Sequence, residues 1–342
     1  MKKNPFLIFF VFLFGLKLDA QCTRAWKILG SPVKDDIHDV FFLNDEIGWA
    51  YTYGTGIILK TVDGGENWQI IARLDPVYFE QIHFLDARIG WICGEQGKVL
   101  KSEDGGKTWL DRSLILPDSN ALLYSQWFFS PDIGLVGGTL RYQGGTTEFC
   151  LFKTNDGGLS WLKMRNNPQV HLTQIVFVNA RVGYAAGGNR IFETRDAGES
   201  WYQVSESQLS NKREGFRGLY FLNENVGYAV GASGEVVSTR DGGNNWEEKK
   251  ITANRLRSVV FVSDSEGYIV GDQNNEEGVL YETKNGGKTW KAIQCEYPDL
   301  HRIIKSNNYI WAVGKEGTIL RKKSEARFSP LEVLNKYHLI IS

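Results

Sequence analysis

The sequence predicts an all-β fold, a seven-bladed β-propeller made of four-stranded antiparallel blades. The first observation is a tryptophan that recurs every 40 to 52 residues, close to the period of one propeller blade. The second is a glycine-containing octapeptide before six of these tryptophans. The third is a series of short apolar stretches separated by turn residues. The recurring tryptophans are Trp26, Trp68, Trp109, Trp161, Trp201, Trp246 and Trp290.

Each repeat unit divides into four expected strands. The first is β-branched and aromatic and ends in Phe, as at residues 40–42, 82–84, 175–177, 219–221 and 259–261. The second begins with Gly and an aromatic residue, as at 48–49, 90–91, 183–184, 227–228 and 267–268. The third follows a glycine-containing turn, as at 57–60 and 98–101, and the recurring Trp opens the fourth. Four short strands bounded by turn residues favour one antiparallel blade.

The octapeptide before the Trp predicts a hairpin between the third and fourth strands. Its acidic or amide residue can accept hydrogen bonds from turn amides, and its glycines supply backbone angles that other residues resist. The string matches the Asp-box, which is found in sialidases and other propeller families. We expect a structural role, because one Asp in each loop is too few oxygen ligands for tight calcium binding. A calcium or sugar site is the alternative. The Asp-box residues are Asp63, Asp104, Asp156, Asp196, Asp241 and Asn285.

The two ends of the repeat region predict how the ring closes. Residues 301–321 repeat the first three strands of a blade, but no octapeptide or Trp follows them. Residues 26–29 form a fourth strand with no blade before it. The N-terminal strand is therefore expected to complete the last blade, which removes exposed sheet edges and gives seven blades.

Residues 1–20 are expected to be a signal peptide, because two lysines precede an apolar run at 6–16 and Ala20 offers a small residue for cleavage. The propeller is expected to span residues 21–324. Residues 325–342 form a partly apolar C-terminal tail that we expect to pack on the ring. The protein is therefore expected to be exported, to the periplasm or the extracellular space.

The cysteines allow two further interpretations. A lipid anchor at Cys22 is not expected, because Asp19 and Gln21 fit a lipobox poorly. A disulfide between Cys22 and Cys295 is one alternative for an exported chain, and two free thiols are the other. Cys93 and Cys150 lie on apolar strand patterns and are expected to be buried thiols.

Charge and motif content exclude several classes of function. The chain has 39 basic and 40 acidic residues, which argues against a nucleic-acid binder driven by electrostatics. The Arg-Ile-Pro tripeptide of sialidases, paired metal ligands, a phosphate loop and a nucleophile elbow are all missing from the sequence. We expect no catalytic residues, no cofactor and no metal, and we expect a monomer.

The start of each first strand should line the mouth of the central channel. Counting four residues back from the Phe at the strand end gives His38, Glu80, Ser125, Thr173, Arg217 and Arg257, with His301 in the last blade. Cations therefore gather on blades five to seven and would suit a carboxylate or phosphate. The alternative is that they only line a water-filled channel. The expected partner-binding residues are His38, Glu80, Arg213, Arg217, Arg255, Arg257, His301 and Arg302.

Insertions at residues 141–148 and 272–277 occupy corresponding loops of blades three and six, between the second and third strands. They should lie on one face of the ring, where they could flank a binding surface. The alternative is that both insertions are surface loops whose sequences have diverged without a binding role.

The repeat as a whole resembles the photosystem II stability/assembly factor family, over residues 26–321. The Leu-Arg-x-Val pattern of that family is similar to residues 216–219 and 256–259, and to 300–303 with His at the Arg position. In blades one to four other residues stand in place of this Arg. The resemblance implies an exported seven-bladed propeller whose arginine patch docks onto a membrane-protein partner.

Two functions follow as hypotheses. The first is a non-catalytic scaffold that binds a protein, expected to be a membrane or envelope protein. The second is a glycan-active or glycan-binding propeller similar to sialidases or xyloglucanases. A glycosidase needs two carboxylates about 5–10 Å apart in a groove lined by exposed aromatic residues.

Overall fold

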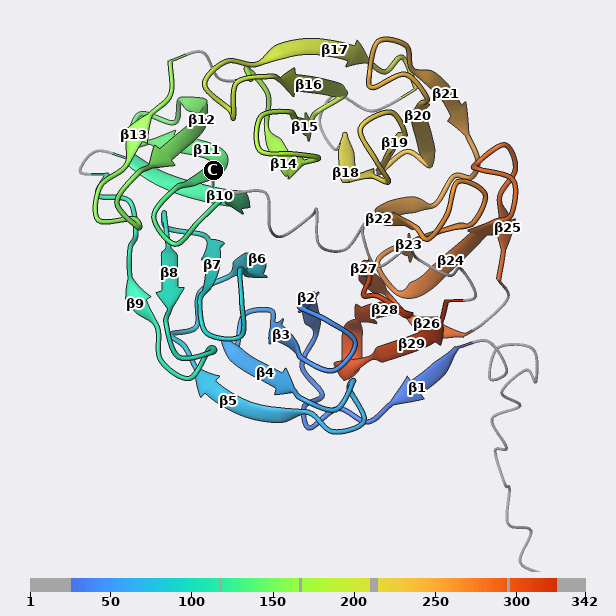
Figure 1. The fold of residues 1–342 in the computed structure, drawn as a ribbon, viewed down its shortest axis with the longest axis horizontal. Helices are drawn as coiled ribbons and strands as arrows, with labels where there is room; N and C mark the ends of the chain where they lie inside the picture. Colours follow the sequence, from blue (N-terminus) through green and yellow to red (C-terminus); the bar gives the residue numbers. More distant parts are fainter. Residues whose placement is uncertain (1–25, 117–118, 166–167, 210–214, 294–295, 325–342) are drawn as a thin grey trace, which may run out of the picture.

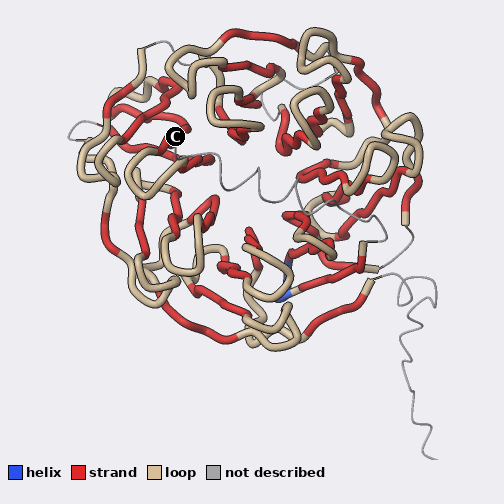
Figure 2. Tube along the Cα trace, viewed as in Figure 1, coloured by secondary structure: helices blue, strands red, loops and turns tan. Residues whose placement is uncertain are grey.

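Seven antiparallel sheets surround a central channel in the computed structural model, which describes residues 26–116, 119–165, 168–209, 215–293 and 296–324. Each sheet is one blade, and its first strand lies next to the channel (Figure 1). Figure 2 shows strands in every blade and a single short helical turn within the described residues, the 3-10 helix Lys315–Gly317. The predicted seven-bladed propeller is confirmed.

The first three blades follow in chain order. Blade one contains β2 (Ile37–Phe42), β3 (Gly48–Thr52), β4 (Ile57–Thr61) and β5 (Gln69–Arg73). Blade two contains β6 (Phe79–Phe84), β7 (Gly90–Gly94), β8 (Val99–Ser102) and β9 (Leu110–Asp111). Blade three contains β10 (Ser119–Phe128), β11 (Gly134–Tyr142), β12 (Thr147–Thr154) and β13 (Leu162–Lys163).

The next three blades repeat this plan. Blade four contains β14 (Leu172–Phe177), β15 (Gly183–Gly187), β16 (Arg190–Thr194) and β17 (Tyr202–Glu206). Blade five contains β18 (Phe216–Phe221), β19 (Gly227–Gly231), β20 (Glu235–Thr239) and β21 (Glu247–Lys250). Blade six contains β22 (Arg255–Phe261), β23 (Gly267–Gln273), β24 (Glu277–Thr283) and β25 (Lys291–Ala292), and β26 (Tyr297–Pro298) also pairs with β24.

Blade seven combines the two ends of the repeat region. It contains β27 (Leu300–Lys305), β28 (Tyr309–Gly314), β29 (Ile319–Lys323) and, on the outside, β1 (Lys27–Leu29). In the antiparallel pair of β1 and β29, Lys27 lies opposite Arg321 and Leu29 opposite Ile319. Figure 1 shows β1 at the rim beside β29. The expected closure by the N-terminal strand is therefore confirmed.

A stack of aromatic rings joins neighbouring blades and explains the spacing of the repeat. Phe84 of blade two stacks on Trp49 of blade one with ring centroids 3.8 Å apart, and Trp109 meets Phe84 edge-on. A Cβ atom at Gly90 would lie only 2.3 Å from the Phe84 ring, so this position before the second-strand aromatic residue requires Gly. Equivalent stacks join Phe42 to Trp311, Phe128 to Trp91, Phe221 to Tyr184 and Phe261 to Tyr228.

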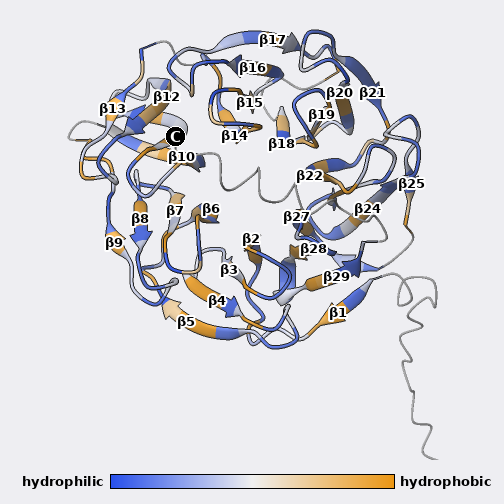
Figure 3. Ribbon diagram, in the orientation of Figure 1, coloured by the Kyte–Doolittle hydropathy of each residue, from blue (hydrophilic) through white to orange (hydrophobic). Residues whose placement is uncertain are grey.

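The distribution of hydropathy follows this packing. The second strands β3, β7, β15 and β19 are buried along their whole length, as expected for strands between neighbouring blades. The outer strand β21 consists of four exposed charged residues and is hydrophilic in Figure 3. The hydrophobic core is therefore divided into clusters between neighbouring blades.

The Asp-box hairpin of blade two shows why its residues recur. Asp104 accepts hydrogen bonds from the backbone N–H groups of Lys107 and Thr108, at 3.0 and 2.9 Å. Ser102 donates to Asp104 and accepts a bond from the N–H of Gly106. Burial acts to raise the pKa of Asp104, but these hydrogen bonds outweigh it and lower that pKa to about 2.

We expect the substitution Asp104→Ala to lower the free energy of unfolding by about 1 kcal/mol, as for the loss of a capping side chain. The control is Asp104→Asn, because Asn285 accepts the equivalent bonds from Thr283 and Thr289 in blade six. The Asn variant should lose clearly less stability than the Ala variant in urea unfolding. Equal losses would contradict the role given to the acceptor oxygens.

Candidate functional site at the channel mouth

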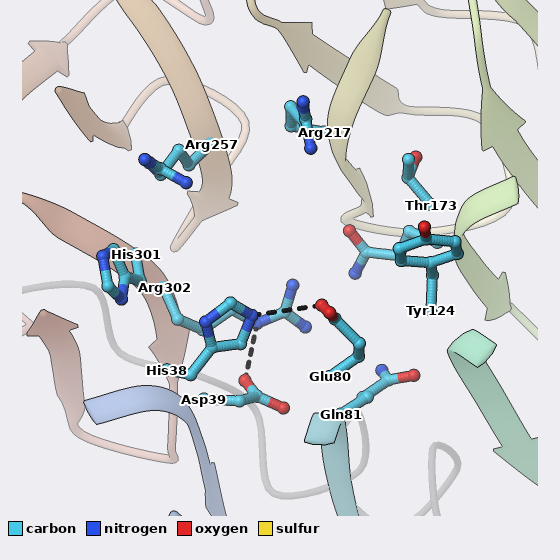
Figure 4. Close-up of a pocket in the computed structure, with 11 residues that line it drawn as sticks. His38, Asp39, Glu80, Gln81, Tyr124, Thr173, Arg217, Arg257, His301 and Arg302 are labelled. Atoms are coloured by element: carbon cyan, nitrogen blue, oxygen red, sulfur yellow. Dashed lines mark ion pairs between the residues drawn. The ribbon is translucent and has the colours of Figure 1, made fainter. Parts of the chain in front are cut away.

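Seven β-bulges, one in each inner strand, build the mouth of the channel. At each bulge the register with the second strand shifts by one residue, for example between Ile37 and Asp39 in blade one. A bulge leaves one residue out of the ladder and re-aims its side chain. The bulged residues are His38, Glu80, Tyr124, Thr173, Arg217, Arg257 and His301. All seven line a cavity of about 120 Å³, which Figure 4 shows.

Blade three differs from the sequence prediction at this ring. The inner strand ends at Phe128, which stacks on Trp91, whereas the prediction counted back from Phe129. The bulged residue is therefore Tyr124 and not Ser125. Ser125 is buried, and its Oγ atom accepts a hydrogen bond of 2.8 Å from the N–H of Ile175 in blade four. Two consecutive Phe residues made the two registers indistinguishable in the sequence.

Acidic side chains hold most of the predicted cations in place. Arg257 lies 2.8 Å from Asp272 and 3.1 Å from Asp299, and both acids are buried. The same Asp299 lies 3.3 Å from the imidazole Nε2 of His301. These two acids come from the same side of the ring as the cations, and the sequence prediction did not include them.

Next to His301, where blades seven, one and two meet, two further pairs form. The guanidinium Nε of Arg302 lies 3.1 Å from Asp39, and Nε2 of His38 lies 3.3 Å from Glu80 (Figure 4). Arg217 also lines the cavity, and its side chain is exposed. The mouth therefore carries both signs of charge, and Arg217 is more exposed than Arg257 and Arg302.

Burial and neighbouring groups shift the pKa values of the side chains at the mouth. It raises the pKa of Asp39, and the charge of Arg302 and the N–H of Ile82 only partly oppose it. Burial also lowers the pKa of His301, while its bond to Asp299 acts in the other direction. Burial alone would raise the pKa of Asp299, but the contacts with His301 and Arg257 lower it. At neutral pH we therefore expect a carboxylate at Asp299 and a neutral imidazole at His301.

Below the mouth, a belt of hydrogen bonds joins the inner strands of neighbouring blades. Asp39 accepts from the N–H of Ile82 at 3.0 Å, and Gln81 accepts from the N–H of Gln126 at 2.7 Å. Gln174 accepts from the N–H of Leu219 at 2.9 Å. The inner strands are sheet edges whose amides face the next blade, so these side chains satisfy donors that the blades themselves leave unpaired.

Of the remaining predicted residues, those that the structure describes lie apart from this cavity. Arg255 lies 3.8 Å from Asp272 and contacts Asn275 in the extended loop of blade six. Arg213, like Cys22 and Cys295, falls outside the residues that the structure describes. The Asp-box residues lie in the hairpins between the third and fourth strands, away from the channel. Cys93 and Cys150 are buried free thiols, as expected.

Neither a metal-binding cluster nor a membrane-spanning helix is present among the described residues. They contain no group of three or more His, Cys, Asp or Glu side chains arranged to hold a metal ion. They also contain no helix of the length and apolar character that a membrane crossing requires.

These features define a class of protein, a seven-bladed Asp-box propeller with a mixed-charge channel mouth. The family model described as "Photosynthesis system II assembly factor YCF48" matches residues 74–170 and 211–300, more than half of the chain. The chain belongs to this family.

Curated relatives agree with this assignment. The photosystem II assembly lipoprotein Ycf48 of Synechococcus sp. (strain CC9902) is 25% identical over 252 residues, covering 70% of each chain. The chloroplastic photosystem II stability/assembly factor HCF136 of Arabidopsis thaliana is 26% identical over 243 residues, covering 66% of this chain and 58% of the relative.

A solved structure described as YCF48 bound to D1 peptide superposes with a TM-score of 0.67 at 19% identity, covering 88% of this chain and 97% of that one. An ancestral GH74 enzyme superposes with a TM-score of 0.64 at 14% identity, covering 86% of this chain and 45% of that one. At these identities the structures share the fold.

Proposed function

We propose that this protein is an exported, non-catalytic assembly factor that binds a segment of a membrane or envelope protein at the channel mouth. The observation that carries the proposal is the convergence of seven bulged side chains on one cavity, among which Arg217 is exposed. Membership of a family of assembly factors supports it. So does the neighbour that binds a D1 peptide, because its fold is the same.

The size and charge of the mouth indicate what it would bind. A cavity of about 120 Å³ can take one side chain or one chain terminus, but not a folded element. Arg217 would pair with a carboxylate of the bound segment, while Glu80 would accept its amide hydrogens. An extended peptide carries all of these groups.

A non-catalytic role is supported by the state of the carboxylates at the mouth. Each of Asp39, Asp272 and Asp299 is buried beside an arginine, and Glu80 faces His38. Glycoside hydrolysis needs one carboxyl group that donates a proton and a second that attacks or activates water. Carboxylates that neutralise structural cations are poorly placed for either task.

The substitution Arg217→Glu tests the proposal. We expect it to lower recovery of the partner from the native envelope at least about tenfold, because a hydrogen bond to a charged group contributes about 1.5–3 kcal/mol. The matched control is Arg181→Glu, which changes an exposed arginine in a turn at the opposite end of the channel. The measurement is affinity capture of the exported protein followed by quantitative mass spectrometry.

Equal recovery by wild type and Arg217→Glu, with a specific partner present in both, would contradict binding through the mouth. Loss of recovery in both variants would indicate a general charge effect and would also contradict the proposal.

A glycan-binding propeller is the second candidate, and one observation favours it. Tyr53 and Tyr78 are 38% and 44% exposed on the mouth side, and their rings lie 4.5 Å apart. The His38 ring stacks on Tyr53 at 4.8 Å. Exposed rings of this kind suit the apolar face of a sugar. Retention of the protein on a polysaccharide, abolished by Tyr53→Ala with Tyr78→Ala, would favour this function over peptide binding.

The domain boundaries belong to the same proposal. We place a signal peptide at residues 1–20 and the propeller at 21–324. The mature protein would then start at residue 21 and be located outside the cytoplasm. The signal peptide, Cys22 and residues 325–342 lie outside the described residues. Several relatives are named lipoproteins, whereas this chain has Asp19 and Gln21 where a lipobox would need small or apolar residues. We therefore propose soluble export.

A further inference from the structure

A second and larger cavity, of about 500 Å³, opens at the end of the channel opposite the mouth. Its wall includes one inward-facing residue from each inner strand, three positions after the bulge. These residues, here called the apolar ring, are Phe41, His83, Trp127, Val176, Tyr220, Val260 and Ile304. The volume lies in the range of about 300–1,000 Å³ that is typical of pockets that bind molecules.

The apolar ring is uncharged at physiological pH. Burial lowers the pKa of His83 to about 4, so its imidazole is neutral. The His83 ring contacts Phe41 edge-on at 5.0 Å and stacks near Trp127 at 5.8 Å. Six of the seven ring residues are apolar or aromatic, and most of them are only half-buried. An apolar concavity of this size facing water favours an occupant that covers it.

The belt of hydrogen bonds separates this cavity from the mouth. Asp39, Gln81, Gln174 and Arg302 contribute to the walls of both cavities and lie between them. The charged bulge residues line the mouth, whereas the turns after the inner strands, including Asn179 and Asn307, line the apolar cavity. The two cavities therefore differ in position and in chemistry, and an occupant of one need not contact the other.

The last strand of the propeller, β29, ends at the side of the ring where the larger cavity opens. Lys323 at the end of β29 lies opposite Tyr309, next to the turn that lines the cavity. The N–H of Ser324 donates a 2.7 Å hydrogen bond to the carbonyl of Asn308, and its neighbour Asn307 is part of the cavity wall. β29 is the third strand from the channel, so two strand spacings, about 10 Å, separate it from the inner strand.

The sequence after Ser324 has the composition and length to fill the cavity. Residues 325–342 include a partly apolar stretch at 331–334, which contains Glu332, and an apolar stretch at 339–341, with Phe328 before them. Eighteen residues can extend about 60 Å, several times the distance to the channel axis. Because the segment is covalently attached, its effective concentration at the cavity would be in the millimolar range.

We propose that an apolar stretch within residues 325–342 binds in the cavity lined by the apolar ring. The ring buries the aliphatic side chains of the tail, and the neutral His83 avoids the cost of placing a charge beside them. The segment acts on its own propeller, and the role is independent of what binds at the mouth.

Site-specific photo-cross-linking in the full chain tests this directly. A benzophenone amino acid replaces Ile340, and the cross-linked peptides are identified by mass spectrometry. We expect adducts on the apolar ring, and we expect the substitution Val176→Lys to lower their yield at least tenfold. Val176→Leu, which keeps the wall apolar, should retain them. The same photoreactive residue at exposed Ile28 on β1 should give no ring adducts.

A second measurement tests the proposal without the Val176→Lys variant, so that its result holds even where that variant misfolds. The chain ending at Ser324 should bind a synthetic peptide of residues 325–342, and the same peptide with Ile340→Asp and Ile341→Asp should bind at least tenfold more weakly. Adducts at the mouth or on the outer strands, adducts joining two differently isotope-labelled copies, or a small apolar molecule retained in the cavity of the full chain would each overturn the proposal.

Discussion

Replacing Arg302 with alanine is expected to lower the free energy of unfolding by about 3 kcal/mol at neutral pH. The reason is Asp39, whose side chain is only 4% exposed and lies 3.1 Å from the guanidinium. Removing one partner of a buried pair leaves the other charge without compensation, which costs about 3–5 kcal/mol. We take the lower end of that range because Arg302 is itself 23% exposed. Urea unfolding followed by tryptophan fluorescence measures the loss.

The matched control removes the charge and keeps the acceptor. In an Asp39→Asn background the amide oxygen can still accept from the N–H of Ile82, as the carboxylate does at 3.0 Å. In this background Arg302→Ala should lower the free energy of unfolding by about 1 kcal/mol or less, because no buried charge is left without a partner. A cost as large as in the wild-type background would show that Arg302 acts through packing and would contradict the ion-pair argument.

The pH dependence of the same variant has a defined sign. Burial raises the pKa of Asp39 in the folded protein, so folding favours the protonated form and this contribution to stability declines as pH rises. Removing Arg302 raises that pKa further. The stability deficit of Arg302→Ala should therefore be largest at neutral pH and shrink as the pH is lowered and Asp39 becomes protonated. A deficit that grows on acidification would contradict this assignment.

The second large effect is expected at the closure of the ring. Trp26 is 1% exposed, and its ring meets Tyr268 of blade six edge-on at 5.7 Å. It packs in the core cluster that joins blades six and seven, just before the closing strand β1. Trp26→Ala removes this contact and leaves a cavity, at a cost of about 3–5 kcal/mol in the free energy of unfolding.

Ile28 provides the control in the same strand, because its side chain is 52% exposed. Ile28→Ala should change stability by about 0.5 kcal/mol or less, as expected for a surface position. Hydrogen exchange should also speed up at β29 in Trp26→Ala, since β1 pairs with that strand. If both variants lost the same stability, or if exchange changed equally in every blade, the closing strand would have no special role in holding the ring.

The blades were predictable because their signals are local. The Asp-box of blade two folds through contacts within seven residues, from Ser102 to Thr108, so its sequence is sufficient to recognise it. The Gly before each second-strand aromatic residue reflects a contact within one hairpin, such as Gly90 against Phe84. Ring closure followed from counting strands, because the last blade has only three strands in its own segment and residues 26–29 supply the fourth.

The candidate site was predictable only in part. The spacing from the terminal Phe placed His38, Glu80, Thr173, Arg217 and Arg257 correctly at the mouth, since one bulge recurs at the same step in these blades. In these five blades the residue that lines the mouth could therefore be identified from the sequence. The charge at the mouth did not follow from it, because charge depends on which loops arrive beside each arginine.

Sequence by itself determined the number of blades, their closure and the positions that face the channel, because each depends on hairpins and on a repeat of fixed length. Only the tertiary structure decided that Asp272 and Asp299 neutralise Arg257, because these acids come from the end of β23 and the approach to β27. It also placed Tyr124 rather than Ser125 at the mouth, where two adjacent Phe residues left the register open. Contacts between elements distant in the chain follow from packing, and no local pattern records them.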